Sequence, residues 1–244
     1  MDTQLINRRL TIVMPVYNEA EVIEAVVRDL YEKVIQKIPT VEFIIAEDGS
    51  TDGTKEILKT LNKEIPFVLI SGRDRKGFTK AFKDALAIAK TDLVFFSDSD
   101  GQHDPADIFT LLKEIDNYDI VSGIKSPRRD PIHRVVISRI YNLLLYLLFG
   151  LKMKDIDSGF KLIKKKVIDN VLNEVMSLKY CVMSEFILKA YLKGYRIKEV
   201  PVIHYSRKSG TTNIFNPKEL LFIILQIIKG LLEIKFSLIR LKKI

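Results

Sequence analysis

The transition from an apolar strand to a pair of carboxylates constrains this chain more than any other feature. Residues 93–96 form an apolar run that predicts a buried strand, and Asp98 and Asp100 follow it directly. Ligands of open α/β sheets bind outside the carboxyl ends of the strands. Carboxylate oxygens suit Mg²⁺ and Mn²⁺, and these cations in turn suit a diphosphate. The pair therefore predicts a cation site, although an acidic turn that only ends a strand would look the same.

Apolar strands and amphipathic helices alternate around this pair. Strands are expected at residues 10–16, 41–46, 67–70 and 93–96, with helices between them. This alternation predicts a doubly wound α/β fold with a mostly parallel sheet. Further strands are expected at 119–122, 161–163 and 197–203, the last at a sheet edge because Pro201 lacks a backbone N–H. Neither Gly-x-Gly-x-x-Gly nor Gly-Lys-Ser/Thr occurs in the sequence, which argues against dinucleotide-binding and P-loop enzymes.

Length and cysteine content bear on the domain organisation and the compartment. The 244 residues suit one large domain, or one domain with an appendage. We expect a domain at 1–216 and a C-terminal helix at 217–244. Cys181 is the only cysteine, which excludes an internal disulfide and fits a reducing compartment.

The net charge of +8 comes from two segments. Residues 125–139 carry five basic side chains and one acidic one, and residues 217–244 carry six basic and two acidic ones. Concentrated positive charge predicts an anionic partner, such as a phosphorylated substrate or an anionic lipid. Nucleic acid is not expected, since the sequence has neither zinc-ligand spacing nor an aromatic ribonucleoprotein motif.

The C-terminal segment predicts an amphipathic helix. Its uninterrupted apolar run at 220–225, like the run at 143–149, is shorter than the roughly 20 residues that cross a bilayer. Lys235 interrupts the apolar side of this helix. The helix is therefore expected to lie in a membrane interface, or to pack on the domain or on a partner subunit. Its polar residues share one narrow stripe: Gln226, Lys229, Gly230, Glu233, Ser237 and Arg240.

Five motifs follow one another along the chain: Met14-Pro-Val-Tyr-Asn-Glu19, Glu47-Asp-Gly-Ser-Thr-Asp-Gly-Thr54, Ser97-Asp-Ser-Asp-Gly-Gln-His-Asp-Pro105, Asp155-Ile-Asp-Ser-Gly-Phe160 and Glu199-Val-Pro-Val202. Together they resemble the GT-A glycosyltransferases of family 2, and in particular the dolichyl- or polyprenyl-phosphate sugar synthases. The resemblance implies inverting transfer of a hexose from a nucleoside diphosphate sugar to a polyprenyl (dolichyl) phosphate, with Mg²⁺ or Mn²⁺ as cofactor. It also implies a cytoplasmic enzyme, peripheral on the inner face of the membrane, with a membrane protein as a further candidate partner.

The resemblance assigns donor-binding roles residue by residue. It implies that the base and ribose pocket is lined by Pro15, Tyr17 and Glu19, and that the nucleobase contacts Ala46 and Asp48, beside Glu47, where the family often has aspartate. The metal would be held by Asp98, Asp100 and Gln102, with Ser99 against the ribose and Arg207 on the diphosphate. Lys80, near the start of the helix expected at 77–89, is a further donor candidate. The family's lysine six residues after Arg207 is Asn213 here, which puts the grip of the donor loop in doubt.

On the acceptor side, Arg134 and Ser138 match the pair that binds the lipid phosphate in the synthases. Lys125 stands where the family usually has arginine, which keeps the charge but loses the bidentate fork. A phosphate acceptor is already a nucleophile and needs no strong base, whereas a hydroxyl acceptor would need a carboxylate. The candidate catalytic residues are therefore Asp100, through the metal, and Asp157 and Glu185, as bases for a hydroxyl.

Three other functions stay open at this point. A transferase of the same fold could act on a glycan or another hydroxyl acceptor. A non-catalytic nucleotide-sugar-binding subunit would not need the intact pair of Asp98 and Asp100. A nucleotidyltransferase would be expected to carry a glycine-rich basic N-terminal loop, which the sequence lacks.

Overall fold

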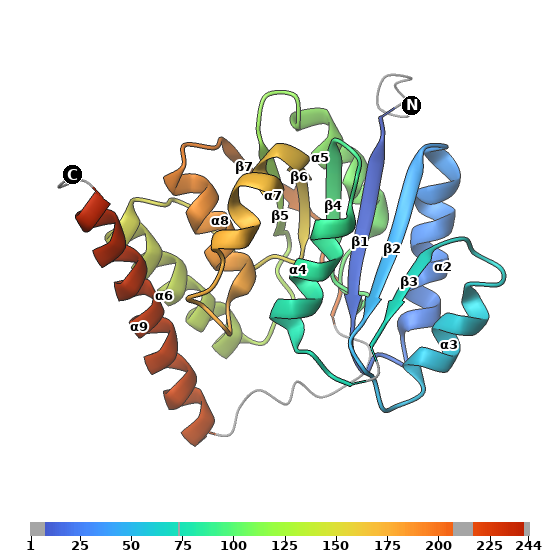
Figure 1. Cartoon of the computed structure of the whole chain (residues 1–244), viewed down its shortest axis with the longest axis horizontal. Helices are drawn as coiled ribbons and strands as arrows, with labels where there is room; N and C mark the ends of the chain where they lie inside the picture. The colour runs from blue at the N-terminus through green and yellow to red at the C-terminus, as the bar shows by residue number, and fades with distance from the viewer. Residues whose placement is uncertain (1–7, 73, 207–216, 242–244) are drawn as a thin grey trace.

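The strand–helix alternation folds into one sheet with helices on both faces (Figure 1). The computed structural model describes residues 8–72, 74–206 and 217–241. Within these residues the sheet has seven strands in the order β3-β2-β1-β4-β6-β5-β7. The strands are β1 (Leu10–Val16), β2 (Val41–Glu47), β3 (Val68–Ser71), β4 (Leu93–Ser97), β5 (Ile120–Lys125), β6 (Phe160–Lys164) and β7 (Ile197–Val202).

The sheet is parallel except at β6, which pairs antiparallel with both β4 and β5. The predicted doubly wound, mostly parallel α/β sheet is therefore confirmed. β7 lies at an edge of the sheet, as Pro201 predicts. Because β1, β2 and β4 are adjacent and parallel, their carboxyl ends meet at one edge of the sheet. The acidic pair follows β4 at this edge.

Two apolar cores flank the sheet. Val94 and Phe96 of β4 point into one core and Phe95 into the other, as the alternation of side chains along a strand requires. The core that contains Phe95 is covered by α2 (Ile23–Lys33), α3 (Thr54–Leu61) and α5 (Ile108–Glu114). The opposite core is covered by α4 (Phe78–Ile88), α7 (Lys165–Val171) and α8 (Val182–Leu192). Short 3₁₀ turns lie at Ile35–Lys37, Pro105–Asp107 and Leu172–Glu174.

Two long helices, α6 (Ile132–Phe149) and α9 (Pro217–Leu241), lie beside α8 at one end of the molecule (Figure 1). The expected C-terminal helix is therefore present, while the division of the chain at residue 216 stays a prediction. α9 packs on the domain through Leu231 and Ile234, which belong to the same core as α8. A Cβ atom at Gly230 would stand 2.5 Å from the carbonyl oxygen of Ser177, so the absence of a side chain allows this close approach.

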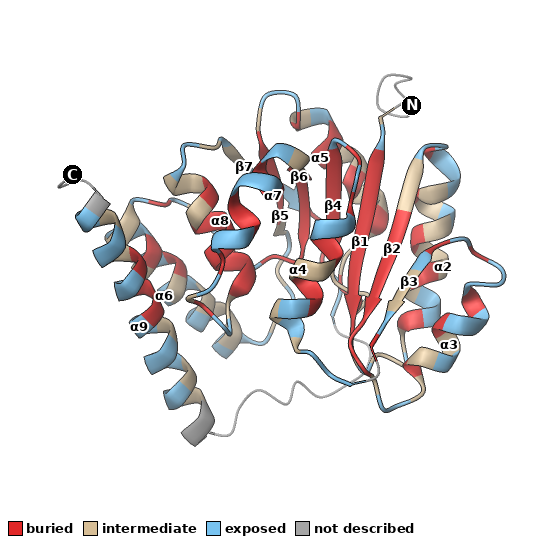
Figure 2. Ribbon diagram, viewed as in Figure 1, coloured by how far each residue is buried: buried red, intermediate tan, exposed pale blue. Residues whose placement is uncertain are grey.

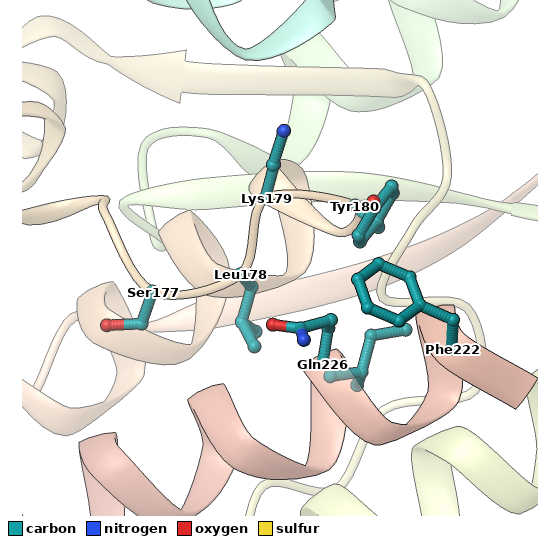
Figure 3. Close-up of a pocket in the computed structure, with 7 residues that line it drawn as sticks. Ser177, Leu178, Lys179, Tyr180, Phe222 and Gln226 are labelled. Carbon is teal, nitrogen blue, oxygen red and sulfur yellow. The ribbon is translucent and has the colours of Figure 1, made fainter.

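Lys235 faces the domain rather than the apolar surface of α9. Its ammonium group donates to the carbonyl oxygen of Leu148 and lies 5.5 Å from the centre of the Phe149 ring. Nearer the start of α9, a cavity of about 160 Å³ separates the helix from the loop at 177–180. Phe222 and Gln226 of α9 line it together with Tyr180 (Figure 3). The contacts of Lys235 and Gly230 thus dock the C-terminal half of α9 on α6 and on this loop.

The outer sides of α6 and α9 are apolar and exposed (Figure 2). On α6 the exposed residues recur with helical period and form a stripe, defined here as Ile132, Val136, Ile140, Leu143 and Leu147. By length and composition α6 could cross a membrane, with a mean hydropathy of 1.4 over 18 residues, of which 11% are buried. The sequence analysis did not predict this, because it counted only uninterrupted apolar runs.

Candidate active site

A cavity of about 400 Å³ opens at the carboxyl ends of β1, β2 and β4. This volume is within the range of sites that hold small ligands. Seven residues with expected donor roles line it: Pro15, Tyr17, Glu19, Asp48, Asp98, Ser99 and Asp100. Val16, Arg75, Phe78 and Ala81 also line it and were not expected. The topology of the sheet thus brings together residues from three separate motifs.

The position of the Asp98 carboxylate depends on Gly159, in the turn before β6. The backbone N–H of Asp98 donates to the carbonyl oxygen of Gly159 at 2.9 Å. A Cβ atom at Gly159 would stand 1.7 Å from Oδ2 of Asp98, so any side chain there would displace the carboxylate. Lys161, fully buried in β6, donates its ammonium protons to the carbonyl oxygen of Ser158 and supports the same turn.

The electrostatics of the pair fit a divalent cation. The pKa of Asp98 is raised to about 7, first because burial removes its carboxylate from water and second because Asp100 repels its charge. A bound cation would relieve both effects. Two carboxylates one residue apart, in a cavity large enough for a phosphate ligand, are the donor set that Mg²⁺ or Mn²⁺ accepts. The residues present therefore fit the implied metal.

The other side of the cavity combines an aromatic ring and a guanidinium group. The guanidinium carbon of Arg75 lies 4.0 Å from the centre of the Tyr17 ring. Arg75 belongs to the loop between β3 and α4, and Asp48 fixes this loop. The Asp48 carboxylate accepts from the backbone N–H groups of Lys76 and Gly77 at 2.7 and 2.9 Å. Asp48 therefore positions the loop as well as facing the cavity.

The loops after β1 and β2 bind one another. The backbone N–H of Glu19 donates to Oγ1 of Thr54 at 2.9 Å, and that of Ala20 donates to Oδ2 of Asp52 at 3.0 Å. Asp52 also accepts from the backbone N–H of Thr54 at 3.1 Å. These contacts explain why the second motif is rich in aspartate and threonine: several of its side chains hold the rim of the cavity rather than facing into it.

Three expected donor residues do not line the cavity. Ala46 is buried in the apolar core. Glu47, also buried, accepts from Oγ of Ser71 at 2.9 Å and forms an ion pair with Lys55, so its carboxylate organises the end of β2. Lys80 is exposed and pairs with Asp84 one helical turn later on α4. Arg207 and Asn213 lie outside the described residues.

Gln102 contacts the chain that leads toward Arg207. Its side-chain Nε2 donates to the carbonyl oxygen of Tyr205 at 3.2 Å, and its backbone N–H donates to Oδ1 of Asp100 at 3.1 Å. Gln102 does not line the cavity of the acidic pair. Its expected role as a metal ligand therefore stays a prediction. In the structure, its side chain contacts the backbone of Tyr205 instead.

The two expected bases have different surroundings. Glu185 is buried, and its carboxylate accepts from the backbone N–H groups of the loop at 176–178 at distances of 2.6–2.9 Å and pairs with Lys189. These contacts occupy both carboxylate oxygens and favour a structural role for Glu185 over the predicted catalytic one. Asp157 is exposed on one side and accepts from Oγ of Ser184. Desolvation by the surrounding protein raises its pKa.

A second cavity, of about 480 Å³, lies between the end of β5, α6 and the turn at 152–155. Its cationic residues are Lys125, Arg128, Arg139, Lys152 and Lys154, and its apolar wall includes Val135, Leu143, Tyr146 and Met153. Lys125 belongs to this cavity and lies near enough to Asp98 to counteract the increase in its pKa. The acidic and basic cavities are therefore neighbours.

The basic cavity differs from the expected acceptor site in two residues. Arg134 and Ser138 do not line it. The Ser138 hydroxyl instead accepts from Nη1 of Arg128 at 3.1 Å and so helps to hold a residue that does. Arg128 and Arg139 were missed by the sequence analysis. The available signal was that Ser138, Arg139 and Asn142 interrupt one side of an otherwise apolar helix.

Substitution of Gly159 by alanine should abolish the cation site while the fold persists. The new Cβ atom would overlap the Asp98 carboxylate and force it out of the cavity. We expect Mn²⁺ affinity, measured by electron paramagnetic resonance, to fall by about tenfold or more. Gly194→Ala is the control, because a Cβ atom there meets open space away from the cavity and adds only the backbone strain of a φ of +83°. Equal Mn²⁺ affinity in the two variants would contradict the role of Gly159.

The stability of the metal-free protein should depend on pH through Asp98. Its pKa is about 7 in the folded protein against 3.8 for the ordinary group, so between these values the folded state holds a proton that the unfolded chain lacks. Stability should therefore fall as pH rises through this window. Urea unfolding in chelator at several pH values measures this slope, which Asp98→Asn should reduce. An unchanged slope in the variant would show that Asp98 titrates normally.

Comparison with known proteins supports this geometry. The sequence profile of glycosyl transferase family 2 matches residues 11–172. The polyprenol monophosphomannose synthase of Mycolicibacterium smegmatis is 27% identical over 220 residues, which are 85% of this chain and 81% of the relative. Glycosyltransferase AglD of Haloferax volcanii is 30% identical over 202 residues, which are 79% of this chain but 32% of AglD, so the chain spans about a third of that protein.

Among solved structures, the mannosyltransferase PcManGT from Pyrobaculum calidifontis, in complex with GDP-Man and Mn²⁺, has the same fold. The TM-score is 0.62 at 21% identity, over 84% of this chain and 59% of PcManGT. The profile match spans β1 through α7 and includes the acidic pair together with the residues that line its cavity. This chain is a member of glycosyl transferase family 2.

Proposed function

We propose that this glycosyltransferase moves a hexose from a nucleoside diphosphate sugar to a polyprenyl phosphate at a membrane surface, with inversion at the anomeric carbon. The observation that carries this proposal is the adjacency of two cavities of opposite character. One holds the acidic pair, and the other has a cationic lining beside an exposed apolar helix. The relative that acts as a polyprenol monophosphomannose synthase supports the same acceptor class.

The donor would occupy the acidic cavity. Tyr17 and Arg75 offer flat surfaces to a nucleobase, and Ser99 and Glu19 offer hydrogen-bonding groups to a ribose. Asp98 and Asp100 would hold the divalent ion, which neutralises charge on the departing diphosphate. The Mn²⁺ and GDP-Man bound to PcManGT are consistent with this use of the cavity, and Mg²⁺ would suit the same oxygen ligands.

Arg207 is proposed to contact the donor diphosphate from the segment that follows β7. This arginine comes two residues after Tyr205, whose backbone N–H donates to the carbonyl oxygen of Gln102 at 2.7 Å. The described segment therefore ends at Ser206, directly after a contact with the loop that follows the acidic pair, and this supports the role that the resemblance implies for Arg207.

The acceptor phosphate would enter the basic cavity. We assign its recognition to Lys125, Arg128 and Arg139, with Arg134 and Ser138 retained as outer contacts because they lie on the same helix. A phosphate monoester carries a charge of about −1.5 to −2 at neutral pH, so it needs cations more than it needs a base. Leu143 belongs both to the wall of this cavity and to the apolar stripe of α6, so a chain attached to the phosphate could lie along the stripe.

The reaction would then be a single displacement. The phosphate oxygen attacks the anomeric carbon, the bond from that carbon to the diphosphate breaks, and the nucleoside diphosphate leaves with the bonding electrons. The protein supplies orientation and charge compensation, through Lys125 on the acceptor side and, on the donor side, through the divalent ion that the acidic pair would hold. Transfer to a hydroxyl would also require removal of a proton, for which Asp157 is the remaining candidate.

The membrane would be reached through the exposed apolar sides of α6 and α9. A helix with a wide apolar side and basic flanks binds at the interface of a bilayer. Arg139 flanks the stripe of α6, and Lys229 and Arg240 lie on the exposed side of α9. The proposed location is the inner face of the membrane, where nucleotide sugars and anionic lipids are both available.

The class of reaction can be tested by following label from the donor. The protein is incubated with labelled GDP-mannose or UDP-glucose, Mg²⁺ or Mn²⁺ and a polyprenyl phosphate, and the organic phase is counted. Label should move into the organic phase with one of the donors, and Asp98→Asn should reduce this transfer by about a hundredfold or more. Asp92→Asn, an exposed carboxylate at the opposite end of β4, should retain activity.

Two results of this assay would contradict the proposal. Transfer only to water-soluble hydroxyl acceptors would favour the alternative transferase. Binding of a labelled donor without transfer to any acceptor would favour a non-catalytic subunit.

Membrane binding can be tested by charging the stripe of α6. Ile140 and Leu147 are 62% and 70% exposed, so glutamate at both positions should leave the fold intact. Co-sedimentation with vesicles that contain anionic phospholipid should fall by about tenfold or more. Val68→Glu on β3, at the far end of the sheet, provides an exposed apolar control. If the double variant bound vesicles as well as the control, the stripe would not be the membrane contact.

A further inference from the structure

The chain that follows β7 is bound to the loop at residues 102–107, called the acidic loop here. Residues 203–205 are called the strap here. The backbone N–H of Ile203 donates to Oδ2 of Asp107, and that of Tyr205 donates to the carbonyl oxygen of Gln102. His204 forms an antiparallel bridge with His103, and the centres of the two rings are 5.5 Å apart. The strap therefore follows the acidic loop at residues 102–107.

His204 also contacts the acceptor side, through the loop at 126–131. The backbone N–H of Arg129 donates to Nδ1 of His204 at 3.1 Å. A backbone N–H can only donate, so Nδ1 is the acceptor and carries no proton. His204 is fully buried, and this burial lowers its pKa, which keeps the ring neutral and Nδ1 able to accept.

The residues on either side of Arg129 organise the basic cavity. Arg128 lines it. Asp130 is an acceptor for both cations, at 2.7 Å from Nε of Arg128 and 3.4 Å from Nζ of Lys125. The hydrogen bond from Arg129 to His204 therefore anchors the loop at the point between these two side chains. Loss of the bond would remove this contact between the loop and the strap and allow the loop to move.

We propose that His204 is a positioning residue that fixes the loop at 126–131, called the acceptor loop here, relative to the acidic loop, and so keeps the basic cavity in the shape that binds the acceptor phosphate. The His204 ring lies against the ring of His103 in the acidic loop, and its Nδ1 accepts from the backbone N–H of Arg129 in the acceptor loop. This inference rests on the proposed function for the identity of the acceptor. It adds a residue that the motif comparison does not identify, because His204 touches neither cavity and acts through the backbone of Arg129.

A pair of variants separates the hydrogen bond from the bulk of the ring. Asparagine at 204 places its side-chain oxygen near the position of Nδ1, whereas glutamine places it near Nε2. His204→Gln should raise the KM for a short polyprenyl phosphate such as farnesyl phosphate by up to about tenfold, the size expected for the loss of one hydrogen bond. His204→Asn should stay within about threefold of the unmodified protein. The KM for the donor and kcat at saturating acceptor should change little in either variant.

Tyr205→Phe is the matched control. It removes the bond from the Tyr205 hydroxyl to Oδ2 of Asp104, at 3.0 Å, from the same strap without touching the acceptor loop. Its acceptor KM should not change. Equal effects of asparagine and glutamine at 204, or a parallel rise in both KM values, would overturn the proposal and leave His204 with a merely structural role.

Hydrogen exchange gives a second measurement that does not depend on the acceptor. Amides of the peptide that covers residues 126–131 should exchange faster in His204→Gln than in His204→Asn or the unmodified protein. Unchanged exchange in His204→Gln would overturn the proposed anchoring even if polyprenyl phosphate is the acceptor. Conversely, faster exchange without any transfer to polyprenyl phosphate would leave the anchoring intact and reject the proposed function.

Discussion

The carboxylates of Asp98 and Asp100, held close together against their repulsion, are the constraint around which the surrounding loops are arranged. Asp98 and Asp100 leave β4 into a cavity where burial and mutual repulsion raise the pKa of Asp98 to about 7. Their position is fixed by backbone rather than by a neutralising side chain, since Gly159 accepts from the Asp98 N–H and leaves room for its carboxylate. Binding of a divalent cation would stabilise such a site, because the cation offsets the repulsion between the two carboxylates. The neighbouring loops are arranged to bring a ligand to that cation.

Opposite charges lie next to this pair without neutralising it. Lys125 and the buried Lys161 both act on Asp98, yet Lys125 pairs with Asp130 and Lys161 is bound to the carbonyl of Ser158. Placing the cations in a separate cavity allows an anionic acceptor and an anionic donor to approach each other, which direct ion pairs with the acids would prevent. α6 contributes to the basic cavity and to the apolar surface, since one side of the helix lines this cavity and the adjacent stripe is exposed and apolar.

The sequence predicted the elements that depend on local patterning. Alternation of strands and helices predicted the mostly parallel sheet, and Pro201 predicted the edge strand. The carboxylates after β4 predicted a ligand site where the structure has a cavity. What it missed depends on contacts between distant segments. Arg75 faces the cavity because Asp48 accepts hydrogen bonds from the backbone of its loop. The Glu185 carboxylate accepts hydrogen bonds from the loop beneath α9. The apolar run at 143–149 belongs to a longer helix that begins at Ile132, and spacing alone did not show that Arg139 rather than Arg134 lines the cavity.

The most direct test of this account is anomalous X-ray diffraction from crystals grown with Mn²⁺ and a nucleoside diphosphate. The account predicts one strong manganese peak within coordination distance of both Asp98 and Asp100, with the diphosphate oxygens completing the shell. It also predicts that the nucleotide loses its position when the crystals are transferred to chelator. A manganese peak elsewhere, or a nucleotide that binds in the same place without the metal, would contradict the claim that these two carboxylates hold the donor through a cation.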